Sequence, residues 1–486
     1  MSKARAKIEN EAEFFGTESI WRILLKISPP VMLSQLVMSM YNIVDSLFVG
    51  KYSGAGLTAL SVIYPLQLII TALAVGTGVG VNTYMSRMYA KGDVKKANAT
   101  AGTGTMLAVI MWAVFAAISA GIMRPYINAM ANAPEAIEYA YQYGMVVCVG
   151  SLGTFLEGVW SKVHQSHGNM RVPMIAQLAG AGTNILLDWI FIFGMGALKP
   201  MGVLGAAIAT IIGQFISAII VGVKGSKKWQ KPREFADCSK QIYKLGLPSI
   251  FMQLMFTVYI VVLNAILSRF SDEAVQVLGL YYKLQTFFFI PLFGLQTCIV
   301  PVLSFNYARK NYSRDIRIMN DTLIISAVFM LLGVICFEFF PKTFIGIFTK
   351  DEKTLEIGAT AFRIIGSSFI PAVFSLTFPV FFQAIGKSVQ SILLSVIRQF
   401  CGLMPLFYAF SFIGLDYTWI AFPVAETITT IIGFAMYIAQ LKAWKKEQAL
   451  EGDVAPYYDE RLQNATQTKR TRKTSDGKVA LQKYFL

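Results

Sequence analysis

The sequence predicts an all-α integral membrane protein with about twelve transmembrane helices in two parallel six-helix repeats. Hydrophobic residues make up 55% of the 486 positions and charged residues only 15%, and the mean hydropathy is +0.54. This composition is too apolar for a water-soluble chain of this length. Two further observations support the prediction: apolar runs recur along the chain, and the second half repeats the first.

The apolar runs are each long enough to cross a bilayer, because about 20 helical residues span roughly 30 Å of hydrocarbon. In chain order, the first six predicted spans are 25–50, 57–83, 100–123, 139–162, 172–194 and 202–224. The next six are 244–267, 274–305, 321–341, 357–382, 390–413 and 418–440.

The repeat appears when the chain is shifted by 218 residues. Residues 26–90 then align with 244–308 without a gap, and about fifteen positions are identical where chance would give about four or five. The same shift pairs Gln165 with Gln383 and Gly168 with Gly386. Because each half contains an even number of spans, both halves have the same orientation across the membrane.

The net charge of +15 follows the loops in alternation, which is the pattern that orients membrane helices. The loops after even-numbered spans carry most of the Lys and Arg residues, and the opposite loops carry only about seven. The basic side is therefore expected in the cytoplasm together with both termini. We attribute the charge to membrane orientation and expect no nucleic-acid partner.

The predicted spans divide the chain into five parts. These are a cytoplasmic N-terminal segment (1–24), an N-lobe (25–224), a cytoplasmic linker (225–243), a C-lobe (244–440) and a cytoplasmic disordered tail (441–486). The tail is polar, with mixed charges and no hydrophobic periodicity.

A parallel six-plus-six repeat is common in secondary transporters, whose two bundles rock around a central cavity. The sequence contains no G-x-x-x-x-G-K-[ST] loop for ATP. We therefore predict a transporter that is driven by an ion gradient, without a cofactor and without enzymatic activity.

Two acidic residues break the symmetry of the repeat. Asp45 in the first span is aligned with Leu263, and Asp188 in the fifth is aligned with Leu406. The shared fold needs its structural residues in both halves, whereas an ion site is needed only once. Since charged groups inside a membrane are costly and usually face an interior site, Asp45 and Asp188 are candidates for ion coupling.

Depth places two further polar residues near these acids. Asp45 and Asp188 should each lie roughly 8 to 9 Å below the outer ends of their spans. Asn184 precedes Asp188 by one helical turn, and Thr210 should lie at a similar depth in the sixth span. Two carboxylates, an amide and a hydroxyl suit Na⁺, or a proton shared by the two acids.

A substrate cavity is predicted from polarizable, aromatic and polar residues in the spans, which could accept apolar cations. Glu426 in the last span could titrate, hold substrate or serve a structural role. The candidate lining residues are Met38, Tyr41, Tyr64, Gln67, Met255, Tyr259, Gln285 and Glu426.

Three other polar residues receive no transport role from the sequence. Glu157, near the cytoplasmic end of the fourth span, is expected to contribute to a gate or to packing. His164 and His167 have the spacing of a metal pair, but no nearby Cys or carboxylate completes a zinc site, so we expect a solvated loop.

The chain resembles the multidrug and toxic compound extrusion (MATE) family. The resemblance rests on Pro30-x4-Gln35-x5-Tyr41-Asn42-x2-Asp45-Ser-Leu-Phe-Val-Gly50, Gln165-Ser-x-Gly168-Asn169, Asn184-x3-Asp188-x2-Phe-Ile-Phe-Gly and Gly202-Val-x-Gly-Ala-Ala-x-Ala-Thr210. It covers residues of about 20 to 440.

This resemblance implies a V-shaped pair of lobes that exports cationic or amphipathic drugs in exchange for Na⁺ or H⁺ across the cell (inner) membrane. It also implies the family branch whose ion site lies in the N-lobe, with Asp45, Asn184, Asp188 and Thr210 at the matching positions. The expected partners are membrane lipid and small organic cations or amphiphiles, and the expected functional unit is a monomer.

Three functions other than drug export are also considered: a flippase, a prenyltransferase and a passive channel. A lipid-linked oligosaccharide flippase would need basic residues facing its cavity, and few Lys or Arg lie within the spans apart from Lys283, Arg363 and Arg398. An intramembrane prenyltransferase would extend Asn184-x3-Asp188 with a third acid, but that position is Ile192. A passive channel would show flux without coupling to a gradient.

Overall fold

A computed structural model describes residues 13–130, 133–195 and 199–472, and every regular element in these ranges is helical. The first half contains α2 (Ile20–Tyr52), α3 (Gly54–Ala90), α4 (Val94–Met130), α5 (Pro134–Val149), α6 (Leu152–Gln165), α7 (Arg171–Phe193) and α8 (Gly202–Gly225). The second half contains α9 (Pro232–Leu267), α10 (Asp272–Ala308), α11 (Tyr312–Phe339), α12 (Pro341–Gly346), α13 (Glu352–Gly366), α14 (Phe369–Ala384), α15 (Ser388–Val396), the π-helical η1 (Ile397–Leu403), α16 (Met404–Ser411), α17 (Leu415–Thr418) and α18 (Ala421–Arg472).

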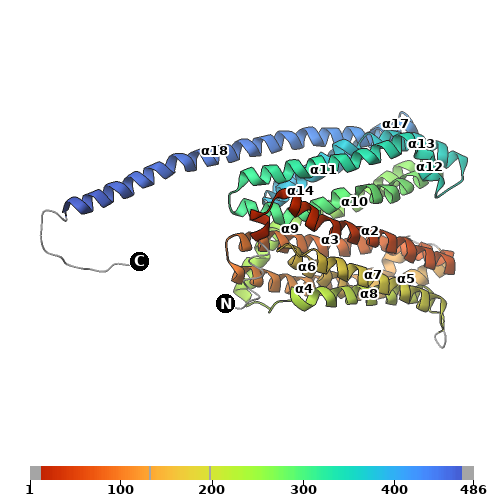
Figure 1. The fold of residues 1–486 in the computed structure, drawn as a ribbon. Helices are drawn as coiled ribbons and strands as arrows, with labels where there is room; N and C mark the ends of the chain where they lie inside the picture. The colour runs from red at the N-terminus through yellow and green to blue at the C-terminus, as the bar shows by residue number, and fades with distance from the viewer. Residues whose placement is uncertain (1–12, 131–132, 196–198, 473–486) are drawn as a thin grey trace. The chain divides into compact units, whose positions relative to one another are not determined.

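The chain forms two compact units, one ending at Gly433 and one beginning at Phe434. The first unit contains the predicted spans of both halves up to the early part of α18. Within this unit, Figure 1 shows the helices of the first half grouped together, with α10, α11, α13 and α14 of the second half forming another group.

Ten helices in the described ranges are long and apolar enough to cross a membrane, and the number rises to twelve if each of two bent pairs counts as one span. The bends are 41° between α5 and α6 and 55° between α13 and α14. The predicted all-helical membrane fold is confirmed. The two bends, however, replace the continuous spans expected at 139–162 and 357–382.

The two bends lie at equivalent places in the repeat. Gly150 and Ser151 separate α5 from α6, while Ser367 and Ser368 separate α13 from α14. Ser151 Oγ donates to the carbonyl of Cys148 at 2.7 Å, and Ser368 Oγ donates to that of Ile365 at 2.6 Å. Serine side chains therefore take carbonyls that an uninterrupted helix would pair with backbone N–H groups.

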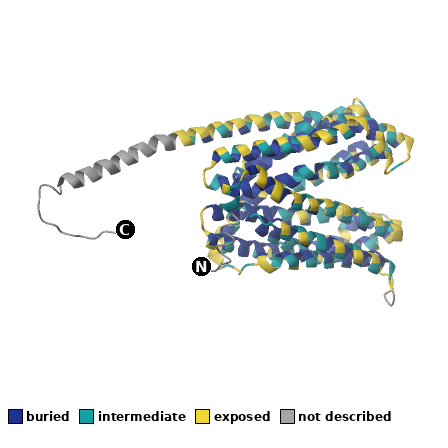
Figure 2. Cartoon of the chain, in the orientation of Figure 1, coloured by how far each residue is buried: buried dark blue, intermediate teal, exposed yellow. Residues whose placement is uncertain are grey.

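Outward faces of the helices are apolar, as lipid contact requires. On α4, Ile110, Val114, Ile118 and Ile122 follow each other at a spacing of four residues and are each about half exposed. Buried residues face the interior of each helix group, and exposed ones lie on its outer faces (Figure 2). Exposed isoleucine in such a stripe is stable in lipid, since the hydrocarbon of the bilayer is the solvent for it.

The two halves pack together where α3 crosses α9 and α2 crosses α10. Glycines allow the backbones of α3 and α9 to approach closely. A Cβ atom on Gly80 would lie 3.0 Å from the backbone nitrogen of Gly246, and one on Gly76 would lie 2.8 Å from that of Ile250. Small residues at a helix crossing are typical of membrane proteins, where close packing drives association.

Arginines fasten the two halves at the C-terminal ends of α3 and α10, which are equivalent positions in the repeat. Arg87 donates to the carbonyl of Ala384 at 2.8 Å, and Arg309 Nε donates to the carbonyl of Ala90 at 3.0 Å. The two Nη atoms of Arg309 also bind both carboxylate oxygens of Glu13 at 2.6 and 2.7 Å. Residues 13–17, which form a helical turn, are thereby attached to this junction.

We expect acid to loosen this attachment. The hydrogen bond from Arg309 lowers the pKa of Glu13 below its ordinary value of 4.5. A carboxylate with a lowered folded pKa stabilises the protein fully above its unfolded pKa, and this stabilisation is lost as the pH falls through the folded value. The pair is about half exposed, so its contribution should stay below about 1 kcal/mol.

Amide hydrogen-exchange protection of residues 13–19, measured between pH 7 and pH 3, tests this expectation. Wild-type protection should fall in the acidic range, whereas Glu13→Gln should show the low value at every pH. An identical pH profile in both proteins would show that another group controls the attachment.

The C-terminal part differs from the tail expected from residue 441. Helix α18 continues to Arg472, and residues 473–486 lie outside the described residues. The segment after Gln440 contains Lys442, Ala443 and Glu447, residue types that favour a helix even without an apolar face. The assignment of cytoplasmic segments, lobes and linker stays a prediction.

Candidate functional site

The four polar residues predicted at the ion site come together within the first half. Asp45 lies on α2, Asn184 and Asp188 lie one turn apart on α7, and Thr210 lies on α8. All four side chains are buried, and Asp188 is 0% exposed. Helix α7 packs against both α2 and α8, which explains how positions far apart in the sequence meet.

Glycines permit the close approach of α7 and α8 beside the site. A Cβ on Gly213 would lie 2.7 Å from the carbonyl oxygen of Gly180 and 3.1 Å from the Cβ of Asn184. Any larger side chain at Gly213 would therefore push the two helices apart. At its C-terminal end, α7 stops at Gly194, whose φ of 79° favours glycine.

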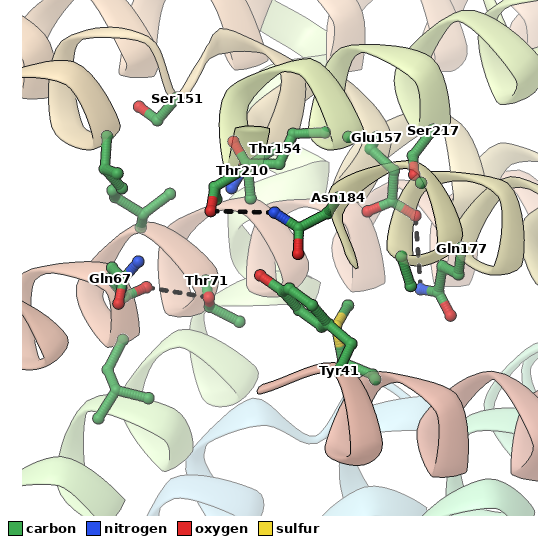
Figure 3. A pocket seen from close by; sticks show the side chains of 18 of the residues that line it. Tyr41, Gln67, Thr71, Ser151, Thr154, Glu157, Gln177, Asn184, Thr210 and Ser217 are labelled. Atoms are coloured by element: carbon green, nitrogen blue, oxygen red, sulfur yellow. Dashed lines mark hydrogen bonds between the residues drawn. The ribbon is translucent and has the colours of Figure 1, made fainter. Parts of the chain in front are cut away.

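Asn184 connects the acid on its own helix with α8. Its side-chain amide lies 3.3 Å from Thr210 Oγ1, as Figure 3 shows. In the amide orientation that satisfies donors and acceptors, its nitrogen donates to Asp188 Oδ2 at 3.0 Å and its oxygen accepts from the Thr210 backbone N–H at 3.0 Å. The amide is therefore held from both sides.

The carboxyl groups of Asp45 and Asp188 lie close enough to interact electrostatically. One oxygen of each, Oδ1, is buried and has no hydrogen-bond partner among the described residues. Two bare carboxylates would repel each other at this range, so the arrangement is stable only with a shared proton or a cation between them. The oxygen donors fit either Na⁺ or a proton.

A cavity of about 300 Å³ adjoins this ion site, and we call it the N-half cavity. Asn184 and Thr210 lie in its wall together with Met38, Tyr41, Tyr64 and Gln67, which the sequence assigned to a substrate cavity. In Figure 3 the Tyr41 hydroxyl points toward Asn184. A solute in this cavity would touch Asn184 and Thr210, two of the side chains predicted to form the ion site.

Glu157 also lines the N-half cavity, and this position was missed by the sequence analysis. Its Oε1 accepts a hydrogen bond from Ser161 at 2.7 Å and one from Gln177 at 3.5 Å. The lining residues of this cavity include no Lys or Arg. Glu157 is therefore the one acidic residue in the lining of this chamber, and its expected part in a gate or in packing stays a prediction.

A second cavity of about 450 Å³ lies between the halves, and we call it the inter-lobe cavity. Helices of both halves line it, including α2, α3 and α6 from the first and α9, α10 and α14 from the second. Gln285, predicted in the substrate cavity, lies here. The candidates assigned to one cavity are thus divided between two.

Three other predicted lining residues, Met255, Tyr259 and Glu426, stand apart from both cavities. Tyr259 is buried, and its ring packs edge-on against Phe256 at 5.2 Å between centroids. Met255, one turn before it on α9, is half-buried. Neither is among the lining residues of the N-half or the inter-lobe cavity.

Glu426 forms a buried ion pair with Arg398, which the sequence analysis did not predict. Arg398 Nε lies 2.9 and 3.0 Å from the two carboxylate oxygens, and Nη2 lies 2.6 Å from Oε1. Ser375 also donates to Glu426. Arg398 lies on the π-helical turn η1, a feature that often marks functional positions.

His164 and His167 correct an expectation. Both are buried rather than solvated, with exposures of 2% and 9%. His164 Nε2 lies 2.9 Å from the carbonyl of Val221 on α8, and the centroids of the two imidazole rings are 5.9 Å apart, with their planes tilted by 55°. Among the described side chains, no group of three His, Cys, Asp or Glu could hold a metal ion. Packing of α6 against α8 explains the burial.

Comparison with known families gives one match that covers most of the chain. The family model described as MatE matches residues 30–190 and again 248–408. The starts of the two matches are 218 residues apart, which is the shift found within the sequence. The internal repeat is confirmed.

Relatives and solved structures agree with this match. The chain is 23% identical over 430 residues to a protein of Shewanella oneidensis named FAD transporter, covering 87% of this chain and 94% of that one. It is 23% identical over 450 residues to the multidrug export protein MepA of Staphylococcus aureus, covering 89% and 96%. A crystal structure of MATE in complex with MaL6 superposes with a TM-score of 0.83 at 23% identity, over 90% of this chain and 99% of that one.

Proposed function

Because this chain belongs to the MatE family of membrane transporters, we propose that it is a secondary active antiporter. It exports cationic or amphipathic compounds in exchange for Na⁺ or H⁺ by alternating access. Relatives named for multidrug export and for FAD transport support an export role, and their names differ enough that the substrate must be argued from this chain.

The buried pair of Asp45 and Asp188 carries the proposal. Two unpartnered carboxylate oxygens beside Asn184 and Thr210 form a site that needs a cation or a proton to be stable. Ionisable groups inside membrane helices cost at least about 2.5 kcal/mol each, so such a pair is retained for a function.

Ion binding would be coupled to substrate release because the proposed ion site adjoins the N-half cavity. Asn184 and Thr210 belong to both, so a bound ion changes the wall that a solute would contact. Ion binding in the outward-facing state would alter the packing of α2, α7 and α8 and disfavour bound substrate. The ion can drive release only to the extent that it binds the two states differently.

The proposal also includes the oligomeric state, the membrane, the orientation and the cofactor requirement of the antiporter. It works as a monomer in the cell (inner) membrane with both termini in the cytoplasm, uses no cofactor apart from the coupling ion, and catalyses no covalent reaction. The alternation of basic loops supports this orientation.

A lipid-linked oligosaccharide flippase is the second candidate. Lys162 and Arg398 line the inter-lobe cavity, and basic groups in a central cavity are what such a flippase would need. Two observations make it the weaker proposal. Glu426 already pairs with Arg398, and a volume of about 450 Å³ suits a drug-sized molecule.

Transport by purified protein in liposomes tests the antiporter. A fluorescent organic solute is loaded, and its efflux is followed under an imposed Na⁺ gradient, an imposed pH gradient, or neither. Efflux that needs one gradient would support the proposal and identify the ion. Equal flux under all three conditions would point to a channel or flippase instead.

A further inference from the structure

We propose that the inter-lobe cavity selects aromatic amphiphiles that carry a carboxylate or phosphate group, and disfavours simple cations. This inference rests on the proposed export function; of the cationic and amphipathic compounds named there, it keeps the amphipathic ones and assigns them a negative charge.

The inter-lobe cavity is lined by two basic residues, Lys162 from α6 and Arg398 from η1. None of its lining residues is Asp or Glu. The N-half cavity has the opposite character, with Glu157 in its wall and no Lys or Arg. Leu68 on α3 lies in both walls, so the two chambers of opposite polarity are neighbours.

Glu157, five residues earlier on α6, lies close enough to interact electrostatically with Lys162, but no described carboxylate forms an ion pair with Lys162. Its Nζ donates to the neutral side-chain oxygen of Gln165 at 2.8 Å. A lysine ammonium carries three donors, so two are left for a ligand. An anion in the cavity would gain a charge-assisted hydrogen bond, and a cation would be repelled.

The ion pair with Glu426 positions Arg398 but occupies only some of the hydrogen-bond donors of its guanidinium group. Nε and Nη2 bind Glu426, whereas Nη1 makes no hydrogen bond with a described residue. The guanidinium therefore presents a fixed donor at the cavity while Glu426 balances its charge. Gln399, which follows it, is buried and lines the same cavity, and its side-chain oxygen lacks a partner.

Both basic residues break the symmetry of the repeat, as the acids of the ion site do. At the shift of 218 residues, Lys162 is equivalent to Val380 and Arg398 to Gly180. The shared fold therefore does not require them. Each half contributes one basic group to a cavity that exists only where the halves meet.

The rest of the wall suits an aromatic body with a hydrogen-bonding edge. Met252, Phe256 and Phe293 provide polarizable and aromatic surface, on which a planar ring can stack. Amide side chains from both halves, among them Gln35, Gln253 and Gln296, provide donors and acceptors. Such a wall offers little to a small inorganic anion.

A pair of dyes with the same ring system tests the inference by binding alone. Fluorescein and rhodamine 123 share a xanthene ring but differ in charge, and the methyl ester of fluorescein lacks its carboxylate. Fluorescence anisotropy with purified protein in nanodiscs measures each affinity, with empty nanodiscs as control. Wild type should bind fluorescein at least about tenfold tighter than rhodamine 123 or the ester.

The variants Lys162→Gln and Lys162→Arg locate the effect. Lys162→Gln should weaken fluorescein binding about tenfold and leave or improve rhodamine 123 binding, while Lys162→Arg should retain the preference. Equal affinities in wild type, tighter binding of rhodamine 123, or no fluorescein binding would each overturn the inference, and none needs a variant that folds. Because no gradient is involved, loss of coupling in the transport assay would leave this result unaffected.

Discussion

Asp188→Asn should abolish gradient-driven efflux, with a loss of at least about tenfold in initial rate. The substitution keeps the size of the side chain and removes the charge that a coupling ion must meet. Asn184 would lose the carboxylate to which its amide donates at 3.0 Å. The ion would then no longer distinguish the two states, and no driving force would reach the substrate.

Asp45→Asn should have the same effect, because each carboxylate supplies one unpartnered oxygen to the site. The double variant should lose no more than either single variant, since the pair acts as one unit. Counterflow without a gradient should persist in all three proteins, because solute exchange needs no ion. This distinguishes a loss of coupling from a loss of folding.

Asp416→Asn is the matched control. Asp416 is an exposed carboxylate on α17 outside the site, so efflux should equal that of wild type. Initial rates in proteoliposomes at equal protein content are the measurement. Full gradient-driven activity in Asp45→Asn and Asp188→Asn would contradict the assignment of the coupling site.

The clustering of the four polar residues could be predicted from the sequence because two of them are exceptional in two ways, while their role in ion coupling stays a proposal. Asp45 and Asp188 are charged within apolar spans, and leucine occupies both equivalent positions in the other half. Helical geometry then placed Asn184 on the face of Asp188. These are local properties, and they need no knowledge of how the helices pack.

The C-half ion pair was beyond this reasoning. Arg398 and Glu426 were each identified as charged groups within spans, but they lie 28 positions apart on different helices. Only packing shows that they meet, and the π-helical turn that carries Arg398 has no sequence signature. The noted charge of both residues was the one signal that could have suggested the pair.

The division of the predicted substrate cavity into two separate cavities could not be predicted from the sequence either. Residue types indicated that Tyr64 and Gln285 face an interior space, but not that they face different ones. Likewise, Lys162 is the last residue of the predicted span 139–162, next to a basic loop, whereas α6 continues to Gln165 and brings the side chain of Lys162 to the inter-lobe cavity. The positions of helix ends decide such cases, and sequence patterns define them poorly.

Glu426→Gln should strongly destabilise the protein, because it leaves Arg398 buried without its counter-ion. The side chains of Arg398 and Glu426 are only 10% and 6% exposed, so water cannot replace the lost partner. Removing one member of a buried pair typically costs about 3 to 5 kcal/mol. Arg398→Met should be destabilising for the same reason, since Glu426 would retain a hydrogen bond from Ser375 but lose three from the guanidinium.

The double variant Arg398→Met with Glu426→Gln should recover most of that stability, because no uncompensated charge remains. Thermal unfolding of the purified proteins in one detergent gives the four midpoints of this cycle. Single variants as stable as wild type would show that the pair is hydrated. If the double variant is stable and the dye preference is retained, Lys162 alone sets the polarity of the inter-lobe cavity. If the preference falls, the free Nη1 of Arg398 contributes to it.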